Sequence, residues 1–148
     1  MQTSLRVAPV SGAVGAVVRG LRLADLDDAT FAALRAAWLE HLVLFFPDQH
    51  VSADEHVAFA RRFGAPEIHP FIPKRDEDHP EIVVLDTDAR ADVFHTDVTF
   101  AATPPLASVL HAVVMPERGG DTIFTNQYLA YETLSAPMQS LLRGLSRS

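Results

Sequence analysis

A histidine and an aspartate stand two residues apart in the segment VFHTDVTF, which spans residues 93–100 and is otherwise rich in apolar side chains. Burying two ionisable groups costs free energy unless something pairs with them. Imidazole and carboxylate suit iron(II), and a site with two histidines and one carboxylate leaves three metal positions open. His95 and Asp97, placed at a strand end, would direct two ligands toward one metal ion. A hydrogen-bonded turn is the alternative interpretation, because this spacing also arises by chance.

Length and composition predict one soluble globular domain. The 148 residues suffice for a single core, and hydrophobic and charged fractions of 48% and 21% are ordinary for a globular protein. The net charge of −7 argues against nucleic acid and membranes as partners, because a basic surface is missing. The absence of cysteine excludes disulfides and thiolate metal sites. The N-terminal sequence shows no signal-peptide pattern, so we expect a cytoplasmic protein.

The first half of the chain carries signals for a sheet and two helices that could position such a site. Residues 12–23 predict a strand with glycine turns, and residues 42–46 predict a short buried strand. Apolar residues at helical spacing predict a helix over residues 29–41, with an aspartate as its N-cap. Ser52 and Glu55 have the spacing of a capping box, which predicts the start of a second helix.

The second half predicts further strands and two terminal helices. Residues 67–81 are rich in proline and acids and predict an exposed loop, in which His79 is expected to be solvated. Strands are predicted at residues 82–85, 106–115 and 122–125, and helices at residues 126–134 and 135–145. The whole pattern predicts an α+β or mainly β fold, with a sheet core and flanking helices.

Together with GGDT at residues 119–122, the motif FHTDVTF resembles the taurine dioxygenase family of iron(II)- and 2-oxoglutarate-dependent oxygenases. Further segments agree with that family in order along nearly the whole chain, namely GAVGAVVRGLRL, LVLFFPDQ, ARRFGAPEIHP and AYETLSAPMQSLLRGL. The resemblance implies a double-stranded β-helix, a jelly-roll or cupin-like core with flanking helices. It also implies Fe(2+) as the metal, with 2-oxoglutarate and O2 as cosubstrates.

The resemblance gives particular residues a role in that chemistry. His95 and Asp97 match two of the three iron ligands, and Thr122 matches the threonine that bonds a carboxylate of 2-oxoglutarate. The implied reaction hydroxylates the carbon next to the sulfonate, sulfate or ether oxygen of a small organic anion. The unstable product gives an aldehyde plus sulfite or sulfate, while 2-oxoglutarate yields succinate and CO2.

Substrate contacts are implied in the same way. His69, in EIHP, matches the histidine that contacts the acidic group of the substrate. Phe94 and Val98 are expected to line the substrate side of the pocket. The apolar residues that flank the pair, Phe94, Val98 and Phe100, predict a dry wall beside the metal. The family usually has tryptophan where this chain has Phe94, and Ala91 replaces a polar side chain. These departures make sulfate esters and aryloxy acids as plausible as taurine.

Members of the family continue well beyond the point that corresponds to Ser148, and their later half supplies the second iron-binding histidine and an arginine for 2-oxoglutarate. Neither role can be assigned here, so we expect residues 1–148 to form a single truncated oxygenase domain, incomplete at its C-terminus and poorly active alone. The alternatives are a catalytically inactive remnant that acts as an interaction module, and an unrelated cupin-like metal-binding module that uses His111. The resemblance also predicts a homo-oligomer, and exposed sheet edges would favour self-association.

Overall fold

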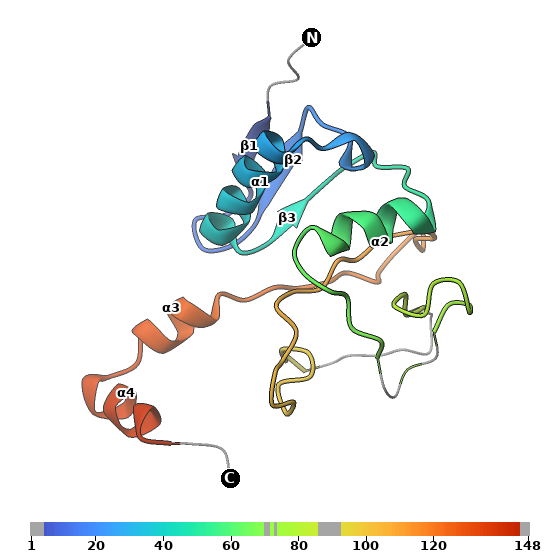
Figure 1. The fold of residues 1–148 in the computed structure, drawn as a ribbon. Helices are drawn as coiled ribbons and strands as arrows, with labels where there is room; N and C mark the ends of the chain where they lie inside the picture. Colours follow the sequence, from blue (N-terminus) through green and yellow to red (C-terminus); the bar gives the residue numbers. More distant parts are fainter. Residues whose placement is uncertain (1–4, 70–71, 73, 86–92, 146–148) are drawn as a thin grey trace.

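A small sheet and two helices form the N-terminal part of the molecule (Figure 1). The computed structural model describes residues 5–69, 72, 74–85 and 93–145. The strands are β1 (Arg6–Pro9), β2 (Ala16–Arg19) and β3 (Leu44–Phe45), and the helices are the 3-10 helix η1 (Leu23–Asp25), α1 (Asp28–His41), α2 (Ala53–Arg61), α3 (Gln127–Glu132) and α4 (Ala136–Arg143). No helix among these described residues is long and apolar enough to cross a membrane.

The sheet has the order β1-β2-β3. Strands β1 and β2 are antiparallel, with Val7 opposite Val18, and β2 and β3 are parallel, with Ala16 opposite Leu44. The strand predicted within residues 12–23 is therefore confirmed as β2, whereas β1 was not predicted. The parallel pair is possible because α1 makes the crossover between β2 and β3.

Helix α1 confirms the helix predicted from residue 29 to residue 41. The side chain of Asp27 accepts a hydrogen bond of 2.7 Å from the backbone N–H of Thr30, as an N-cap residue does. Leu34 is only 1% exposed and faces the core. The rings of Phe31 and Trp38 both meet Phe63 edge to face, with centroids 5.0 and 5.5 Å apart.

Helix α2 confirms the predicted capping box. Ser52 Oγ accepts the backbone N–H of Glu55 at 3.2 Å, and the Glu55 carboxylate accepts the backbone N–H of Ser52 at 2.6 Å. Val57 and Phe59 are the buried residues of this helix. Together with Ala16, Val18 and Leu34 they make up the buried core of the described residues.

Several predicted strands are wrong for this structure. The strand at residues 42–46 is only Leu44–Phe45 and is not buried. Residues 82–85 contribute one isolated bridge, between Val83 and Lys74, and the described residues 106–115 and 122–125 form no strand. A strand is defined by pairing, and the structure places no neighbouring strand beside these apolar segments. The described part of the chain thus shows a three-stranded sheet with helices and not the jelly-roll itself.

Helices α3 and α4 confirm the two helices predicted near the end of the chain. They form a helical hairpin that extends away from the sheet (Figure 1). The hairpin is held by its own polar contacts: the amide of Gln139 donates to backbone carbonyls at the end of α3, and Arg143 Nε donates to the Tyr131 hydroxyl at 2.7 Å. Asn126 ties its start to the sheet region by donating to the carbonyl of Ala13 at 2.7 Å.

Candidate metal site

The segment that carries His95 and Asp97 is a turn. Residues 97–100 turn back on themselves, and the backbone N–H of Ala101 donates to the carbonyl of Val98 at 3.0 Å. The described residues 93–101 belong to no strand, so the expected strand end is wrong for them. The two side chains nevertheless approach each other, so a turn and a ligand pair coexist here.

His95 is oriented by its own backbone. Its Nδ1 lies 3.0 Å from the carbonyl oxygen of Val93, which can accept a hydrogen bond only if Nδ1 carries the proton. The other nitrogen, Nε2, then lies 3.2 Å from Oδ1 of Asp97. This is the arrangement commonly found around metal-binding histidines, in which a carbonyl holds one nitrogen and leaves the other to the metal.

Asp97 is oriented by a residue from another segment. The hydroxyl of Ser108 donates to Oδ2 of Asp97 at 2.9 Å, which leaves Oδ1 turned toward His95. Ser108 was not predicted as a site residue. Its only signal in the sequence is a small polar side chain within the apolar segment 106–115, and eleven positions separate it from its partner.

The electrostatics of the pair favour a positive charge on the ring. The pKa of His95 is raised above its usual 6.5, first because the Val93 carbonyl accepts a hydrogen bond from the ring and also because the Asp97 carboxylate lies beside it, while desolvation acts in the opposite direction. A cation bound between the two side chains would take the place of the proton on Nε2.

The donor atoms fit two adjacent ligands of one metal ion. Two donors that each lie about 2.1 Å from an ion, at right angles to one another, are about 3 Å apart. Nε2 of His95 and Oδ1 of Asp97 are 3.2 Å apart, and imidazole with carboxylate is a donor set that iron(II) accepts. No group of three or more His, Cys, Asp or Glu side chains forms such a site among the described residues. The described chain thus offers two ligands.

The surroundings of the pair are open in this chain. The side chains of His95 and Asp97 are 50% and 55% exposed, and Phe94 is 66% exposed. The expected dry wall is therefore wrong for the described residues. Val98, directly after Asp97, has a φ of +50°, which is unfavourable for a β-branched residue. Backbone strain of this kind often marks functional segments.

The structure does not link the other predicted site residues to this pair. His69 is half-buried, and its Nδ1 accepts the backbone N–H of Ile72 at 3.0 Å. Thr122 is exposed in the segment before α3, and no hydrogen bond joins it to His95 or Asp97 in the described structure. The departure at Ala91 lies outside the described residues. The cosubstrate and substrate roles of His69, Thr122, Phe94 and Val98 stay predictions.

Comparison with known proteins now identifies the class. Residues 6–148 match the family described as taurine catabolism dioxygenase TauD, TfdA family. The chain belongs to this family, which confirms the resemblance seen in the sequence.

Several relatives give the family a functional context. An alpha-ketoglutarate-dependent sulfate ester dioxygenase from Pseudomonas putida is 42% identical over 141 residues, covering 93% of this chain and 46% of that protein. An (S)-phenoxypropionate/alpha-ketoglutarate-dioxygenase from Delftia acidovorans is 35% identical over 160 residues, covering 96% of this chain and 53% of that protein. These relatives are alpha-ketoglutarate-dependent dioxygenases, and the chain spans about half the length of the curated relatives it matches.

A solved structure agrees with the family match and with the similarity to these relatives. The crystal structure of a taurine dioxygenase from Burkholderia xenovorans superposes with a TM-score of 0.86 at 40% identity, covering 95% of this chain and 51% of that one. The arrangement of the small sheet and the helices is therefore that of a dioxygenase of this type.

Proposed function

We propose that this chain supplies two iron ligands, His95 and Asp97, to a 2-oxoglutarate-dependent dioxygenase. The observation that carries the proposal is the approach of Nε2 of His95 to Oδ1 of Asp97, at 3.2 Å, with the other side of each group held by Val93 and Ser108. Family membership and the names of the relatives supply the reaction class.

The proposed substrate is a small organic anion. A sulfate ester is the first choice, because the relative from Pseudomonas putida is named for that activity, and an aryloxy acid is the second, because the relative from Delftia acidovorans is named for phenoxypropionate. The proposed reaction hydroxylates the carbon beside the ester or ether oxygen. The resulting hemiacetal-like or hemiketal-like product would break down to an aldehyde or a keto acid and release sulfate or a phenol.

The residues of this chain would act mainly by position. Bound iron supplies the activation of oxygen, coupled to decarboxylation of 2-oxoglutarate to succinate and CO2. The Val93 carbonyl holds the His95 ring, and the Ser108 hydroxyl holds the carboxylate of Asp97, so that neither ligand must be ordered when the metal arrives.

The remaining roles follow from the family. Thr122 would donate a hydrogen bond to a carboxylate of 2-oxoglutarate, and His69 would contact the acidic group of the substrate. Phe94 and Val98 would line the substrate side of the pocket in the complete fold, where other residues would cover them. The proposed complete fold is a double-stranded β-helix, in which the apolar residues of the segment 106–115 would be paired and buried.

On its own, the 148-residue chain should bind metal weakly and turn over slowly. Two protein ligands hold a metal ion less tightly than three, and the described residues provide no third ligand in reach. The side chains also stand in water, where electrostatic interactions are weakened.

A metal titration tests the assignment of the ligands. Mn(II) is added to the isotope-labelled chain and the paramagnetic broadening of amide signals is followed, and an anaerobic titration with iron(II) and 2-oxoglutarate is followed by the visible absorption of the chelate. Broadening is expected first at residues 93–101 and 108. The His95→Ala and Asp97→Ala variants should lose it, whereas His50→Ala, an exposed histidine elsewhere, should keep it. Equal broadening in all four proteins would contradict the proposed ligands.

A further inference from the structure

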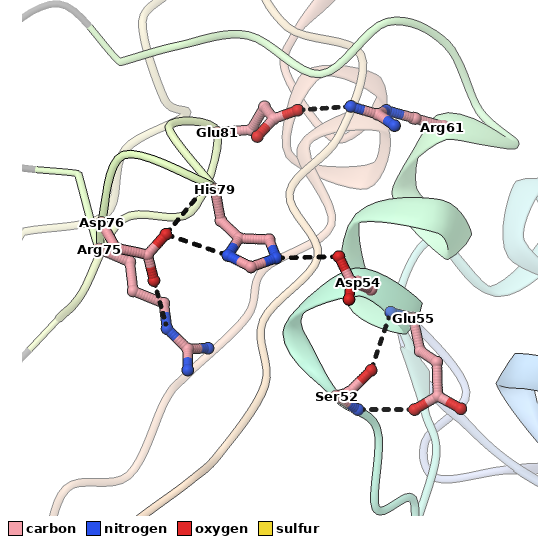
Figure 2. Close-up of polar contacts among 8 residues, drawn as sticks. All are labelled: Ser52, Asp54, Glu55, Arg61, Arg75, Asp76, His79 and Glu81. Carbon is pink, nitrogen blue, oxygen red and sulfur yellow. Dashed lines mark hydrogen bonds and ion pairs between the residues drawn. The ribbon is translucent and has the colours of Figure 1, made fainter.

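His79 joins two segments that are far apart in the sequence (Figure 2). Its Nε2 lies 3.0 Å from Oδ1 of Asp54, in the first turn of α2, and its Nδ1 lies 3.0 Å from Oδ1 of Asp76. The backbone N–H of His79 also donates to Asp76, at 2.7 Å. The side chain is only 19% exposed, so the prediction that His79 is solvated is wrong. It failed because nothing local in the sequence reveals Asp54 as a partner.

The two contacts together define the protonation state of the ring. A carboxylate oxygen can only accept a hydrogen bond, and a neutral imidazole has a single N–H. Both ring nitrogens of His79 face a carboxylate at hydrogen-bond distance, so both must donate. Only the imidazolium can do this. Loss of the proton would leave one nitrogen lone pair facing one carboxylate oxygen, which is repulsive.

The segment that carries His79 is a closed loop, here called the 74–83 loop. Lys74 and Val83 form an antiparallel bridge at its base, and the backbone N–H of Arg75 donates to the carbonyl of Ile82 at 2.7 Å. At its tip the carbonyl of His79 accepts the N–H of Ile82 at 3.1 Å. These backbone contacts close the loop on itself, and its side-chain contacts with Asp54 and Arg61 hold it on α2.

The other charged groups around His79 support the same contact. Arg61, in the last turn of α2, donates to Glu81 of the loop at 2.8 Å, and Arg75 Nε lies 3.3 Å from Oδ2 of Asp76 (Figure 2). Glu81 and Asp54 add negative charge near the ring from the two sides of the contact. A backbone hydrogen bond and the contact with Arg61 lower the pKa of Glu81, although desolvation opposes them, so His79 is the member of this set whose charge changes near neutral pH.

We infer that His79 is a proton-dependent latch, which holds the 74–83 loop on the first turn of α2 when the ring is charged and weakens that hold when the ring is neutral. The loop lies between His69 and His95 in the sequence. If His69 contacts the substrate, as the proposed function has it, release of the latch also loosens the segment that carries this contact. That consequence rests on the proposed function, whereas the latch itself does not.

The pH dependence of the latch follows from the direction of the pKa shifts of His79 and Asp76. Hydrogen bonds to Asp54 and then to Asp76 raise the pKa of His79 above 6.5, although desolvation opposes them. The latch is therefore fully stabilising below pH 6.5 and is lost as the pH rises through the raised pKa of the folded state. Desolvation opposes ionisation of Asp76, but the hydrogen bonds from His79 outweigh it and lower its pKa below 3.8. At the acid end, protonation of Asp76 would remove the contact inside the loop.

The sequence offers a single-site probe of this loop. Lys74 is the only lysine in the chain, so a lysine-specific endoprotease can cut at one peptide bond, directly before Arg75. That bond lies at the base of the loop, where Arg75 is hydrogen-bonded to Ile82. Cleavage requires this base to open, and we expect it to open more often once the loop has left α2. The cleavage rate is measured from pH 5.5 to 9, relative to an unstructured lysine peptide in the same tube. The rate for the wild-type chain should rise through the pKa of His79.

Three variants and a titration complete the test. His79→Gln should be cut faster at low pH and show little dependence on pH, and Asp54→Asn should give an intermediate result. His50→Gln, a matched exposed histidine, should behave like the wild type. NMR titration of the ring should give His79 a pKa above 6.5 that falls in Asp54→Asn. Each unit of that shift should correspond to about a tenfold increase in opening between low and high pH.

Two results would overturn the latch: an NMR pKa of His79 at or below 6.5, or cleavage at Lys74 that is independent of pH and of the His79→Gln change. The NMR measurement uses the folded wild type and Asp54→Asn, so it decides the question even if His79→Gln lowers overall stability. Neither measurement requires metal, cosubstrate or turnover. The latch can therefore fail while the proposed iron site stands, and the iron site can fail while the latch stands.

Discussion

The two halves of this chain differ in how they treat their apolar residues. All five buried hydrophobic residues of the described structure lie between residues 16 and 59, in the sheet, α1 and α2. The segment from residue 93 to residue 145 carries the candidate metal ligands and buries none of its large hydrophobic side chains. Val113 and Val114, in the middle of an apolar run, are 78% and 87% exposed.

Some strands and helices form from segments that are close together in the sequence. Others need a partner that lies far away in the sequence. The strands and helices between residues 6 and 61 find their partners within that stretch, and so they form. The segment 106–115 has the composition of a strand but no strand to pair with in the described residues. We expect its apolar residues to be covered in the longer relatives, of which this chain spans about half.

Hydrogen exchange should show the largest contrast between the two regions. The amide of Ala16 is bonded to the carbonyl of Val43 at 2.9 Å inside the sheet and should exchange only when the whole body opens. The amides of Val113 and Val114 donate to no other described residue and should exchange at close to the rate of an unfolded peptide. We expect rates that differ by several orders of magnitude, measured by NMR. Similar slow exchange at both places would mean that the segment 106–115 is structured in solution, for instance through self-association.

A core substitution should give the next largest effect. Leu34→Ala removes an almost fully buried side chain of α1. We expect it to lower the free energy of unfolding by about 2–5 kcal/mol, because apolar burial is lost and a cavity is left behind. Urea denaturation followed by circular dichroism measures the change. Leu110→Ala is the matched control, because Leu110 is 64% exposed and its truncation should change stability by less than about 0.5 kcal/mol. An equal loss of unfolding free energy in both variants would contradict the proposed difference between the two halves.

The same contrast explains what the sequence could predict. The helix starts at Asp27 and Ser52 are local signals, since each cap bonds an amide three residues away, and both helices form there. The strand signals at residues 82–85, 106–115 and 122–125 were misleading because hydrophobicity favours burial without supplying a partner strand. In the site, the residue types indicated His95 and Asp97, whose ring nitrogen and carboxylate do meet.

The residues that the sequence did not reveal act across a distance in the chain. Ser108 reaches Asp97 from eleven positions away, and His79 reaches Asp54 from twenty-five positions away. A serine or histidine looks the same in the sequence whether it is solvated or engaged. Only the fold brings such pairs together, so their function follows from the structure alone.

Within the second half, the orientation of Asp97 can be tested through its partner. Ser108→Ala removes the hydroxyl that donates to Oδ2 of Asp97. We expect about a 10–100-fold loss of metal affinity, which is the usual effect of removing a hydrogen bond that orients a metal ligand. The change is measured by the concentration of Mn(II) needed to broaden the signals of residues 93–101. Ser140→Ala, at an exposed serine in α4, is the control and should leave the affinity unchanged. If both variants bind as the wild type does, Ser108 has no part in holding the carboxylate.

The smallest predicted effect compares two serines that occupy the same helix position in the two halves. Ser52 caps α2 with its side chain, whereas Ser135 precedes α4 without a side-chain hydrogen bond. Ser52→Ala should therefore lower the free energy of unfolding by about 1 kcal/mol, because the amide of Glu55 loses its partner at the helix start. Ser135→Ala should cost clearly less, and thermal unfolding of the two variants side by side measures the difference. If Ser135→Ala costs as much as Ser52→Ala, then the start of α4 is capped in solution, and the second half of the chain is more ordered than its exposed side chains indicate.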